Sequence, residues 1–174
     1  MRIAFYAPMK SVDHPTPSGD RRMARAFLAV LEELGHVVEV ASSLRSYDRE
    51  GDPARQIAIR NAAEVEVQRL LAGWRTAAGS APDLWFTYHS YHKAPDWIGP
   101  AVASELRIPY VVAEASVAGK QANGAWALGH CATIEGINTA ARVLGLTRVD
   151  TVELAKWLPG NRNLTLFRHS WRNA

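Results

Sequence analysis

Residues 1–41 read "MRIAFYAPMKSVDHPTPSGDRRMARAFLAVLEELGHVVEVA", and this stretch decides the fold. Its short apolar runs at 3–7 and 37–41 predict two strands that are covered on both faces. Between them, apolar side chains recur at three-to-four spacing, which predicts an amphipathic helix that ends at Gly35. The expected buried face of this helix consists of Met23, Ala24, Phe27, Leu28, Leu31 and Leu34.

The same alternation of strand and helix continues along the rest of the chain. Further strands are predicted at 84–89, 110–115 and 163–167, and further helices at 53–77, 95–106, 126–144 and 151–158. The second helix is expected to bury Ile57, Ala62, Val65, Leu70 and Trp74. This order predicts an α/β fold, a single Rossmann-like doubly wound domain with a mostly parallel sheet.

The composition is typical of a globular protein of one domain. The 174 residues are 48% apolar and 21% charged, and no apolar run is long enough to span a membrane. The chain opens without the features of a signal peptide, and the single cysteine fits a reducing cytosol, so we expect a cytoplasmic protein. Cys131 itself is expected to pack in the core. The net charge of +3 suits an anionic small molecule or an anionic membrane surface, and it argues against nucleic acid as a partner.

Four predicted loops follow the carboxyl ends of strands, at 8–19, 42–53, 89–95 and 116–125. In an open parallel sheet, ligands bind in the crevice at these ends. We therefore expect the ligand site along this edge of the sheet.

The first loop leads into Ser18, Gly19, Asp20, Arg21 and Arg22 at the start of a helix. Unpaired N–H groups attract anions there, Gly19 lets a ligand approach the backbone, and the two arginines add positive charge. The alternative is a plain helix start, in which Ser18 caps the helix and Asp20 complements its dipole while repelling a phosphate. Neither a G-x-G-x-x-G nor a Walker pattern is present, and no cofactor is predicted.

The segment "TYHSYHKAPDW" (87–97) follows the third predicted strand and concentrates polar and aromatic side chains. His89 and His92 could act as a base or bind metal, but no third ligand has a recognisable spacing, so we predict no metal site. The rings of Tyr88 and Tyr91, with Lys93 beside them, suit stacking on a sugar or a base. The alternative is a polar loop that merely starts a helix.

A carboxylate follows the hydrophobic strand predicted at 110–115. Glu114 could accept hydrogen bonds from substrate hydroxyls or serve as a base. Ser116 and Lys120 lie in the loop that follows and are further candidates for substrate binding. The alternative is that Glu114 forms an ion pair with Lys120 or Arg107.

Two segments, together with the opening strand, resemble the N-terminal domain of retaining GT-B glycosyltransferases of family 4 (group 1). They are "PSGDRRMARAFLAVLEELGHVVEVAS" (17–42) and "PDLWFTYHSYHKAPDWIGPAVASELRIPYVVAEAS" (82–116). The resemblance rests on the order of the patterns L-x-x-x-G-H-x-V-x-V, P-D-hydrophobic, L-x-I-P and Y-V-V-A-E, and it covers nearly the whole chain.

The resemblance implies a transferase with two Rossmann-like domains that face each other across a cleft. Residues 1–174 would form the half that holds the acceptor, which is a saccharide or a lipid-linked molecule. The half that holds the nucleotide-sugar donor would be a C-terminal domain beyond residue 174 or a partner subunit. Gly19 then lies in the loop that approaches the donor phosphates or the acceptor, and His89 lies near the polar positions after the third strand. Half an active site is expected to transfer no sugar by itself.

One position departs from the family. Many members have a histidine directly after the strand that ends at Glu114, whereas this chain has Ala115, so that role is not transferred. The main alternative to an enzyme half is a non-catalytic Rossmann-like binding domain that associates with itself or with a partner subunit. A nucleotide-dependent oxidoreductase would need a glycine fingerprint after the first strand and an acid after the second, and neither is clear here. A receiver-like domain would need Asp at the end of the third strand, where this chain has Thr87-Tyr88-His89, so that class is rejected. Peripheral association with a membrane stays open.

Overall fold

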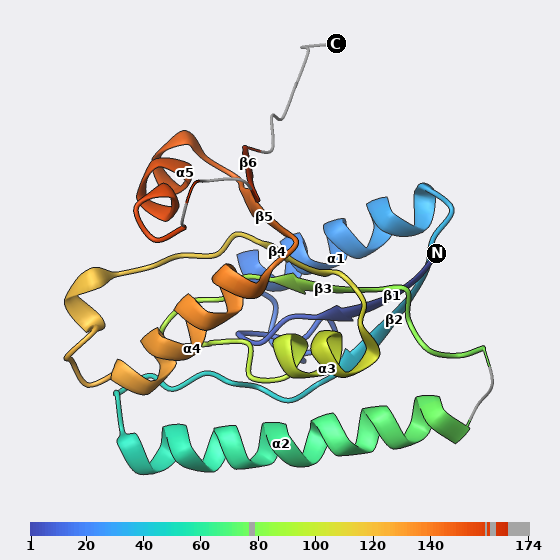
Figure 1. Ribbon diagram of the computed structural model, residues 1–174, viewed down its shortest axis with the longest axis horizontal. Helices are drawn as coiled ribbons and strands as arrows, with labels where there is room; N and C mark the ends of the chain where they lie inside the picture. Colours follow the sequence, from blue (N-terminus) through green and yellow to red (C-terminus); the bar gives the residue numbers. More distant parts are fainter. Residues whose placement is uncertain (77–78, 159, 161–162, 167–174) are drawn as a thin grey trace.

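The computed structural model describes residues 1–76, 79–158, 160 and 163–166. Its strands are β1 (Arg2–Tyr6), β2 (Val37–Ser42), β3 (Leu84–Tyr88), β4 (Tyr110–Ala113), β5 (Arg142–Gly145) and β6 (Leu164–Leu166). Its helices are α1 (Gly19–Glu33), α2 (Pro53–Thr76), α3 (Gly99–Leu106), the short 3-10 helix η1 (Gly119–Gln121), α4 (Ala127–Thr139) and α5 (Arg148–Ala155). The six strands form one parallel sheet in the order β2-β1-β3-β4-β5-β6 (Figure 1), which confirms the predicted Rossmann-like α/β fold.

The sheet separates two hydrophobic clusters. On one face, Ala4, Tyr6 and Trp85 pack with residues of α2, α3, α4 and α5. On the other face, Ile3, Phe5, Phe86 and Val111 pack with α1, which is the one helix of the described chain that contributes to this cluster. Figure 1 shows α1 on the opposite side of the strands from α2 and α3. This distribution follows from right-handed crossovers, because only the step from β1 to β2 runs in the reverse direction along the sheet.

Both ends of α1 are as the sequence predicts. The Ser18 hydroxyl accepts a hydrogen bond from the Arg21 amide at 3.2 Å, so Ser18 is the N-cap. At the other end Gly35 has φ +82°, and His36 N donates to Leu31 O, which is the Schellman arrangement. The predicted buried face is only partly correct, because Met23 and Leu34 are 43% and 67% exposed.

The predicted buried face of α2 is wrong at three positions. Ile57, Ala62 and Val65 are exposed, whereas the helix buries Gln56, Ala63, Val67, Leu70 and Leu71. Apolar side chains lie on more than one side of this helix, so periodicity alone does not select the side that faces the sheet.

The region predicted as one helix over 126–144 is a helix followed by a strand. α4 ends at Thr139, and Arg142–Gly145 form β5, which lies between β4 and β6 in the sheet. The helix end has no glycine or proline signal. Instead the Asn163 amide donates hydrogen bonds to Ile137 O and Ala140 O, at 3.3 and 2.8 Å. This cap comes from a distant segment, so local sequence does not reveal it.

Several smaller expectations need correction. Cys131 is exposed rather than packed in the core. The third helix begins at Gly99 rather than at residue 95, and the last helix spans Arg148–Ala155 rather than 151–158. Residues 77 and 167, which closed a predicted helix and a predicted strand, lie outside the described residues.

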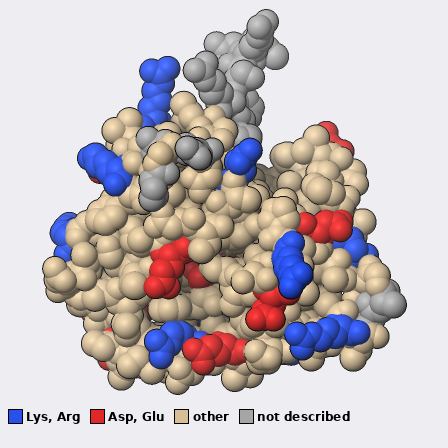
Figure 2. All heavy atoms as spheres, in the orientation of Figure 1, with Lys and Arg blue, Asp and Glu red and all other residues tan. Residues whose placement is uncertain are grey.

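The charged surface has no single dominant sign on the face shown in Figure 2. Lys and Arg alternate with Asp and Glu there, most clearly along α2 at the lower edge. Among the described residues, no helix combines the length and the apolar character needed to cross a membrane.

Candidate small-molecule site at the carboxyl edge

The strand order reverses between β1 and β3, which are neighbours in the sheet. From β1 the chain crosses to β2 on one side, and from β3 it crosses to β4 on the other. The loops after β1 and β3 therefore diverge and leave a crevice at the carboxyl edge, where ligands bind in folds of this type. Both loops carry candidate residues from the sequence.

The centre of this region is a pair formed by Asp20 and His89. Asp20 lies in the first turn of α1 and His89 directly follows β3, and Asp20 Oδ1 lies 2.9 Å from His89 Nδ1. The two side chains are 27% and 19% exposed, so a ligand can reach them. The contact favours the imidazole tautomer with its proton on Nδ1, which leaves Nε2 free to accept a hydrogen bond from a ligand.

A second acid lies at the end of the neighbouring strand. Tyr88 at the end of β3 forms a side-chain hydrogen bond with Glu114, which directly follows β4. Burial raises the pKa of the Tyr88 hydroxyl, and the nearby carboxylates of Glu114 and Asp20 raise it further. Tyr88 therefore stays protonated and donates to Glu114. Among the described residues Glu114 has no ion pair with Lys120 or Arg107.

The backbone is unusual at both strand ends. His89 and Glu114 have φ +61° and +57°, and the third non-glycine residue with positive φ in the described chain, Arg107, closes α3. Residues other than glycine adopt this conformation at a cost of about 1–3 kcal/mol, and they do so most often at functional sites. Here the turns hold both side chains at the edge of the sheet: His89 N donates to Ala113 O, and Glu114 N donates to Leu144 O.

Tyr91 links the loops after β3 and β4. Its ring stacks on the His89 ring with centroids 5.0 Å apart, and its backbone forms bridges with Ala94 and Ser116. Burial, followed by the charges of Tyr47 and Asp20, raises the pKa of Tyr91 to about 12. Ser116 thus contributes to the site through its backbone: its amide donates to Ser90 O.

His92 and Lys93 lie on the other side of Tyr91, around Trp126. The His92 ring contacts Tyr91 and Trp126 edge to face, at 5.3 and 5.7 Å between centroids, and the Lys93 ammonium lies 4.3 Å from the centre of the Trp126 ring. Lys120, in η1, is exposed but close enough to influence the pKa of His92. These residues form a basic, aromatic flank of the site rather than its centre.

Two arginines of α1 contact the loop after β1. Arg21 and Arg25 each donate from Nε to Val12 O, at 3.2 and 2.8 Å. Together with Pro17, Ser18, Gly19 and Arg22 they line an open cavity of about 440 Å³. Sequence reasoning missed Arg25, although its spacing of one helical turn from Arg21 and Arg22 was a usable signal.

The variant Gly19→Ala tests whether a ligand approaches the backbone at this cavity. A Cβ at position 19 would meet no heavy atom within 4 Å. We expect Gly19→Ala to keep the free energy of unfolding within about 1 kcal/mol of the parent, because alanine is the better helix former. If methyl glycosides enter this cavity, their binding measured by calorimetry should weaken, since the added methyl group projects into the open space. Unchanged affinity would remove Gly19 from the site.

Sequence reasoning also missed a group of buried polar atoms beside Trp126. Asp48 Oδ2, His92 Nδ1 and His130 Nδ1 are buried without a hydrogen-bond partner in the described structure. Asp48 accepts a hydrogen bond from the Trp126 indole through its backbone carbonyl, at 3.0 Å. His92 was already a predicted site residue, whereas Asp48 and His130 come from separate segments that only the fold brings to it, so no local pattern could identify them.

This group predicts a dependence of stability on pH. Burial lowers the pKa of His130, and burial together with the charges of Lys93, His130 and Lys120 lowers that of His92. The unfolded chain, with ordinary histidines of pKa about 6.5, then binds more protons than the folded chain, so the free energy of unfolding falls as the pH drops below about 6.5. Urea unfolding at several pH values should show this slope, and a His92→Gln/His130→Gln variant should show a flatter one. Equal slopes would contradict the assignment.

Within the described residues no three His, Cys, Asp or Glu side chains are arranged to hold a metal ion.

The comparisons with known proteins leave the family open. The chain matches no model of a known protein family, and no curated protein matches it.

Proposed function

We propose that the chain binds a hydroxyl-rich acceptor, a saccharide or a lipid-linked saccharide, at the carboxyl edge of the sheet. It would act as the acceptor-side half of a retaining glycosyltransferase that uses a nucleotide-sugar donor. The observation that carries this proposal is the Asp20–His89 pair at 2.9 Å, at the point where the strand order reverses. The family resemblance of the sequence supports the reaction class.

The chemistry of the site suits a sugar. Carboxylate oxygens of Asp20 and Glu114 and His89 Nε2 can accept hydrogen bonds from hydroxyl groups. The stacked rings of His89 and Tyr91 offer flat apolar faces beside these acceptors. Saccharide sites combine the same two features, since a sugar presents hydroxyls at its rim and C–H groups on its faces.

In the proposed reaction the acceptor hydroxyl oxygen bonds to the anomeric carbon of the donor sugar from the same face on which the diphosphate departs, which retains the configuration, and His89 receives the hydroxyl proton. The bond from that carbon to the diphosphate breaks, and the nucleoside diphosphate leaves with the bonding electrons. Asp20 holds the imidazole in the required tautomer and stabilises the imidazolium that forms. A second domain would bind the leaving diphosphate, because positioning and charge stabilisation supply most of the rate in such a transfer.

A binding screen tests this function. The purified chain, and the chain extended through any sequence that follows residue 174, are titrated calorimetrically with nucleotide sugars, methyl glycosides and NAD. We expect methyl glycosides to bind both forms, nucleotide sugars to bind only the longer form, and the 174-residue chain to transfer no sugar. Sugar transfer by the short form, or its tight binding of NAD, would refute the proposal.

A non-catalytic binding domain is the second candidate, and the exposed apolar side chains of α1 favour it. Met23, Val30 and Leu34 are 43%, 49% and 67% exposed on one side of this helix. An apolar patch of this kind is typical of an interaction surface. Saccharide binding that survives every substitution at Asp20 and His89 would favour this reading.

A further inference from the structure

Basic side chains gather where the loops after β3 and β4 meet the start of α4. His92 and Lys93 follow β3, Lys120 lies in η1, and His130 lies in the first turn of α4. Figure 1 shows η1 and the start of α4 at the same end of the molecule. Burial lowers the pKa of His92, and the charges of Lys93, His130 and Lys120 lower it further. These four residues, the basic cluster, are therefore close enough to influence one another.

Two glycines allow the elements that carry the basic cluster to pack closely. A Cβ on Gly129 would collide with His92 O, so glycine lets the start of α4 approach the loop after β3. A Cβ on Gly119 would lie 3.0 Å from the Trp157 ring, so η1 also packs tightly. The Trp157 ring in turn contacts His130 edge to face, with centroids 5.5 Å apart. Close backbone packing thus brings η1, α4 and the loop after β3 together around the basic cluster.

The basic cluster has no acidic partner among the residues that the structure describes. None of its members forms an ion pair there, and the Lys93 ammonium instead lies 4.3 Å from the centre of the Trp126 ring. The Nδ1 atoms of His92 and His130 are buried without a hydrogen-bond partner, and His130 is only 6% exposed. Because a buried N–H without an acceptor is costly, the neutral rings favour the tautomer that donates from Nε2. Two ammonium groups and two such donors suit an anion.

Backbone hydrogen bonds hold the elements around the basic cluster in place. Gln56 of α2 is 5% exposed, and its side-chain oxygen accepts a hydrogen bond from Gly129 N at 3.2 Å. Asp48 N donates to Lys93 O at 2.8 Å, and Asp48 O accepts from the Trp126 indole at 3.0 Å. A ligand therefore meets loops that are already ordered, which lowers the entropic cost of binding.

A row of rings joins the basic cluster to the Asp20–His89 pair. The Tyr91 ring stacks on the His89 ring with centroids 5.0 Å apart, and the His92 ring contacts Tyr91 at 5.3 Å. The His92 ring therefore lies at most about 10 Å from the His89 ring. One sugar ring with a phosphate on its anomeric oxygen is long enough to bridge this distance. A single ligand can thus contact His89 through a hydroxyl and the basic cluster through its phosphate.

We propose that the acceptor is a glycosyl phosphate and that the basic cluster binds its phosphate. Lys93 and Lys120 supply positive charge, and His92 and His130 donate hydrogen bonds from Nε2. This assignment rests on the proposed function, since that function puts the sugar beside His89. The phosphate belongs either to a free sugar phosphate or to the headgroup of a lipid-linked sugar, because both present the same group.

Calorimetric titration of the purified chain tests the phosphate subsite. α-Glucose 1-phosphate and α-mannose 1-phosphate are each compared with the corresponding methyl α-glycoside, so that the phosphate is the difference between the two ligands. We expect each sugar phosphate to bind about 10- to 100-fold more tightly, the usual effect of one or two hydrogen bonds to a charged group. Farnesyl phosphodiesters of the same sugars distinguish the two sources. Tighter binding of the farnesyl ester indicates a lipid-linked acceptor, and equal binding indicates a free sugar phosphate.

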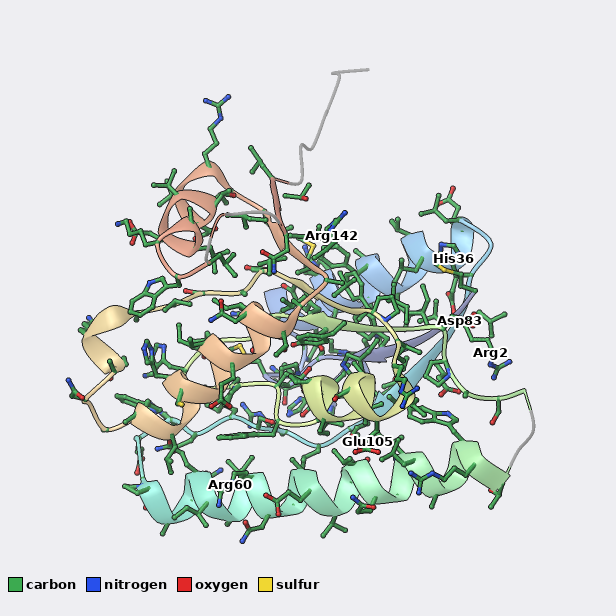
Figure 3. The ribbon with its side chains drawn as sticks, in the orientation of Figure 1. Arg2, His36, Arg60, Asp83, Glu105 and Arg142 are labelled. Carbon is green, nitrogen blue, oxygen red and sulfur yellow. The ribbon has the colours of Figure 1, made fainter. Side chains whose placement is uncertain are left out.

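A double variant tests whether the basic cluster supplies this gain. Lys93→Gln/Lys120→Gln should bind each sugar phosphate and its methyl glycoside with affinities that differ by no more than about threefold, because the positive charge is lost. The control is Arg2→Gln/Arg142→Gln, which removes the same charge at the amino ends of β1 and β5 (both labelled in Figure 3). These ends lie at the opposite edge of the sheet, so the control should keep the full ratio. Circular dichroism establishes that both variants are folded.

The outcomes separate the phosphate subsite from the proposed function. Methyl glycosides that do not bind at all would overturn both. Sugar phosphates that bind no more tightly than methyl glycosides would overturn the phosphate subsite alone. A gain that survives in Lys93→Gln/Lys120→Gln would do the same.

Discussion

Replacing Asp96 with alanine should lower the free energy of unfolding by about 3–5 kcal/mol, the largest single effect on stability that the structure predicts. Asp96 is 3% exposed and accepts four hydrogen bonds. The amides of Ile98 and Gly99 donate to Oδ1 at 2.8 and 2.7 Å, and the hydroxyls of Thr87 and Tyr110 donate to Oδ2 at 2.5 and 3.3 Å. Alanine would leave these buried donors without partners.

The carboxylate holds two elements in place at once. Its Oδ1 binds the amides at the start of α3, and its Oδ2 binds side chains of β3 and β4. Burial raises the pKa of Asp96, and the bonds from Gly99, Thr87, Ile98 and Tyr110 oppose that rise. Since burial of a carboxyl group is itself unfavourable, the net loss in the alanine variant is smaller than the sum of four broken hydrogen bonds.

A matched control separates the buried network from simple helix capping. Asp52 is exposed and accepts a hydrogen bond from the Ala54 amide at the start of α2, at 2.9 Å. Asp52→Ala should cost only about 0.5–2 kcal/mol, the usual value of a cap. Denaturant unfolding of both variants gives the comparison. Equal losses would mean that Asp96 contributes nothing beyond its cap.

The second large effect is expected at His89. His89→Ala should weaken saccharide binding at least about tenfold and, in a form that transfers sugar, lower kcat about 10²–10⁴-fold, the usual contribution of a general base. Asp20→Asn should lower kcat less and leave KM nearly unchanged, because Asn can still accept from the Nδ1 proton but does not stabilise the imidazolium as a carboxylate does.

His36 provides the matched control for this prediction. It directly precedes β2 at the amino edge of the sheet, on the same side of Figure 3 as the labelled Asp83, which precedes β3, whereas His89 follows β3 at the carboxyl edge. His36→Ala removes the same side chain from the same fold and should leave binding and transfer unchanged. Equal losses in the His36 and His89 variants would show that the effect is structural.

Most of the fold follows from local sequence, and its errors have identifiable physical causes. All strands except β5 were predicted. The caps of α1 are correct because Ser18 and Gly35 act on neighbouring residues, as the N-cap bond to Arg21 shows. The boundary between α4 and β5 was missed because Asn163, more than twenty residues away, caps the helix. The buried side of α2 was misjudged because the sheet, rather than the helix, decides which apolar side chains are covered.

Part of the site was also predictable from local sequence. His89, Glu114 and Tyr91 follow strand ends, and parallel strands bring their carboxyl ends to one edge. The partners were not predictable: the contact of Asp20 with His89 spans 69 residues, and the hydrogen bond of Tyr88 with Glu114 joins two strands. Asp20 was predicted as a substrate-binding residue at the start of α1, or alternatively as a complement to the helix dipole, and its contact with His89 was not foreseen.

The imidazole nitrogen resonances of His89 test the central claim most directly. In a ¹⁵N-labelled chain, long-range ¹H–¹⁵N spectra report the tautomer of each histidine, and His89→Gln assigns the signal. We expect the neutral His89 ring to carry its proton on Nδ1, and methyl α-glucopyranoside or methyl α-mannopyranoside to shift the Nε2 resonance in a saturable manner. A ring protonated on Nε2, or an Nε2 resonance unchanged by both glycosides at saturating concentration, would contradict it.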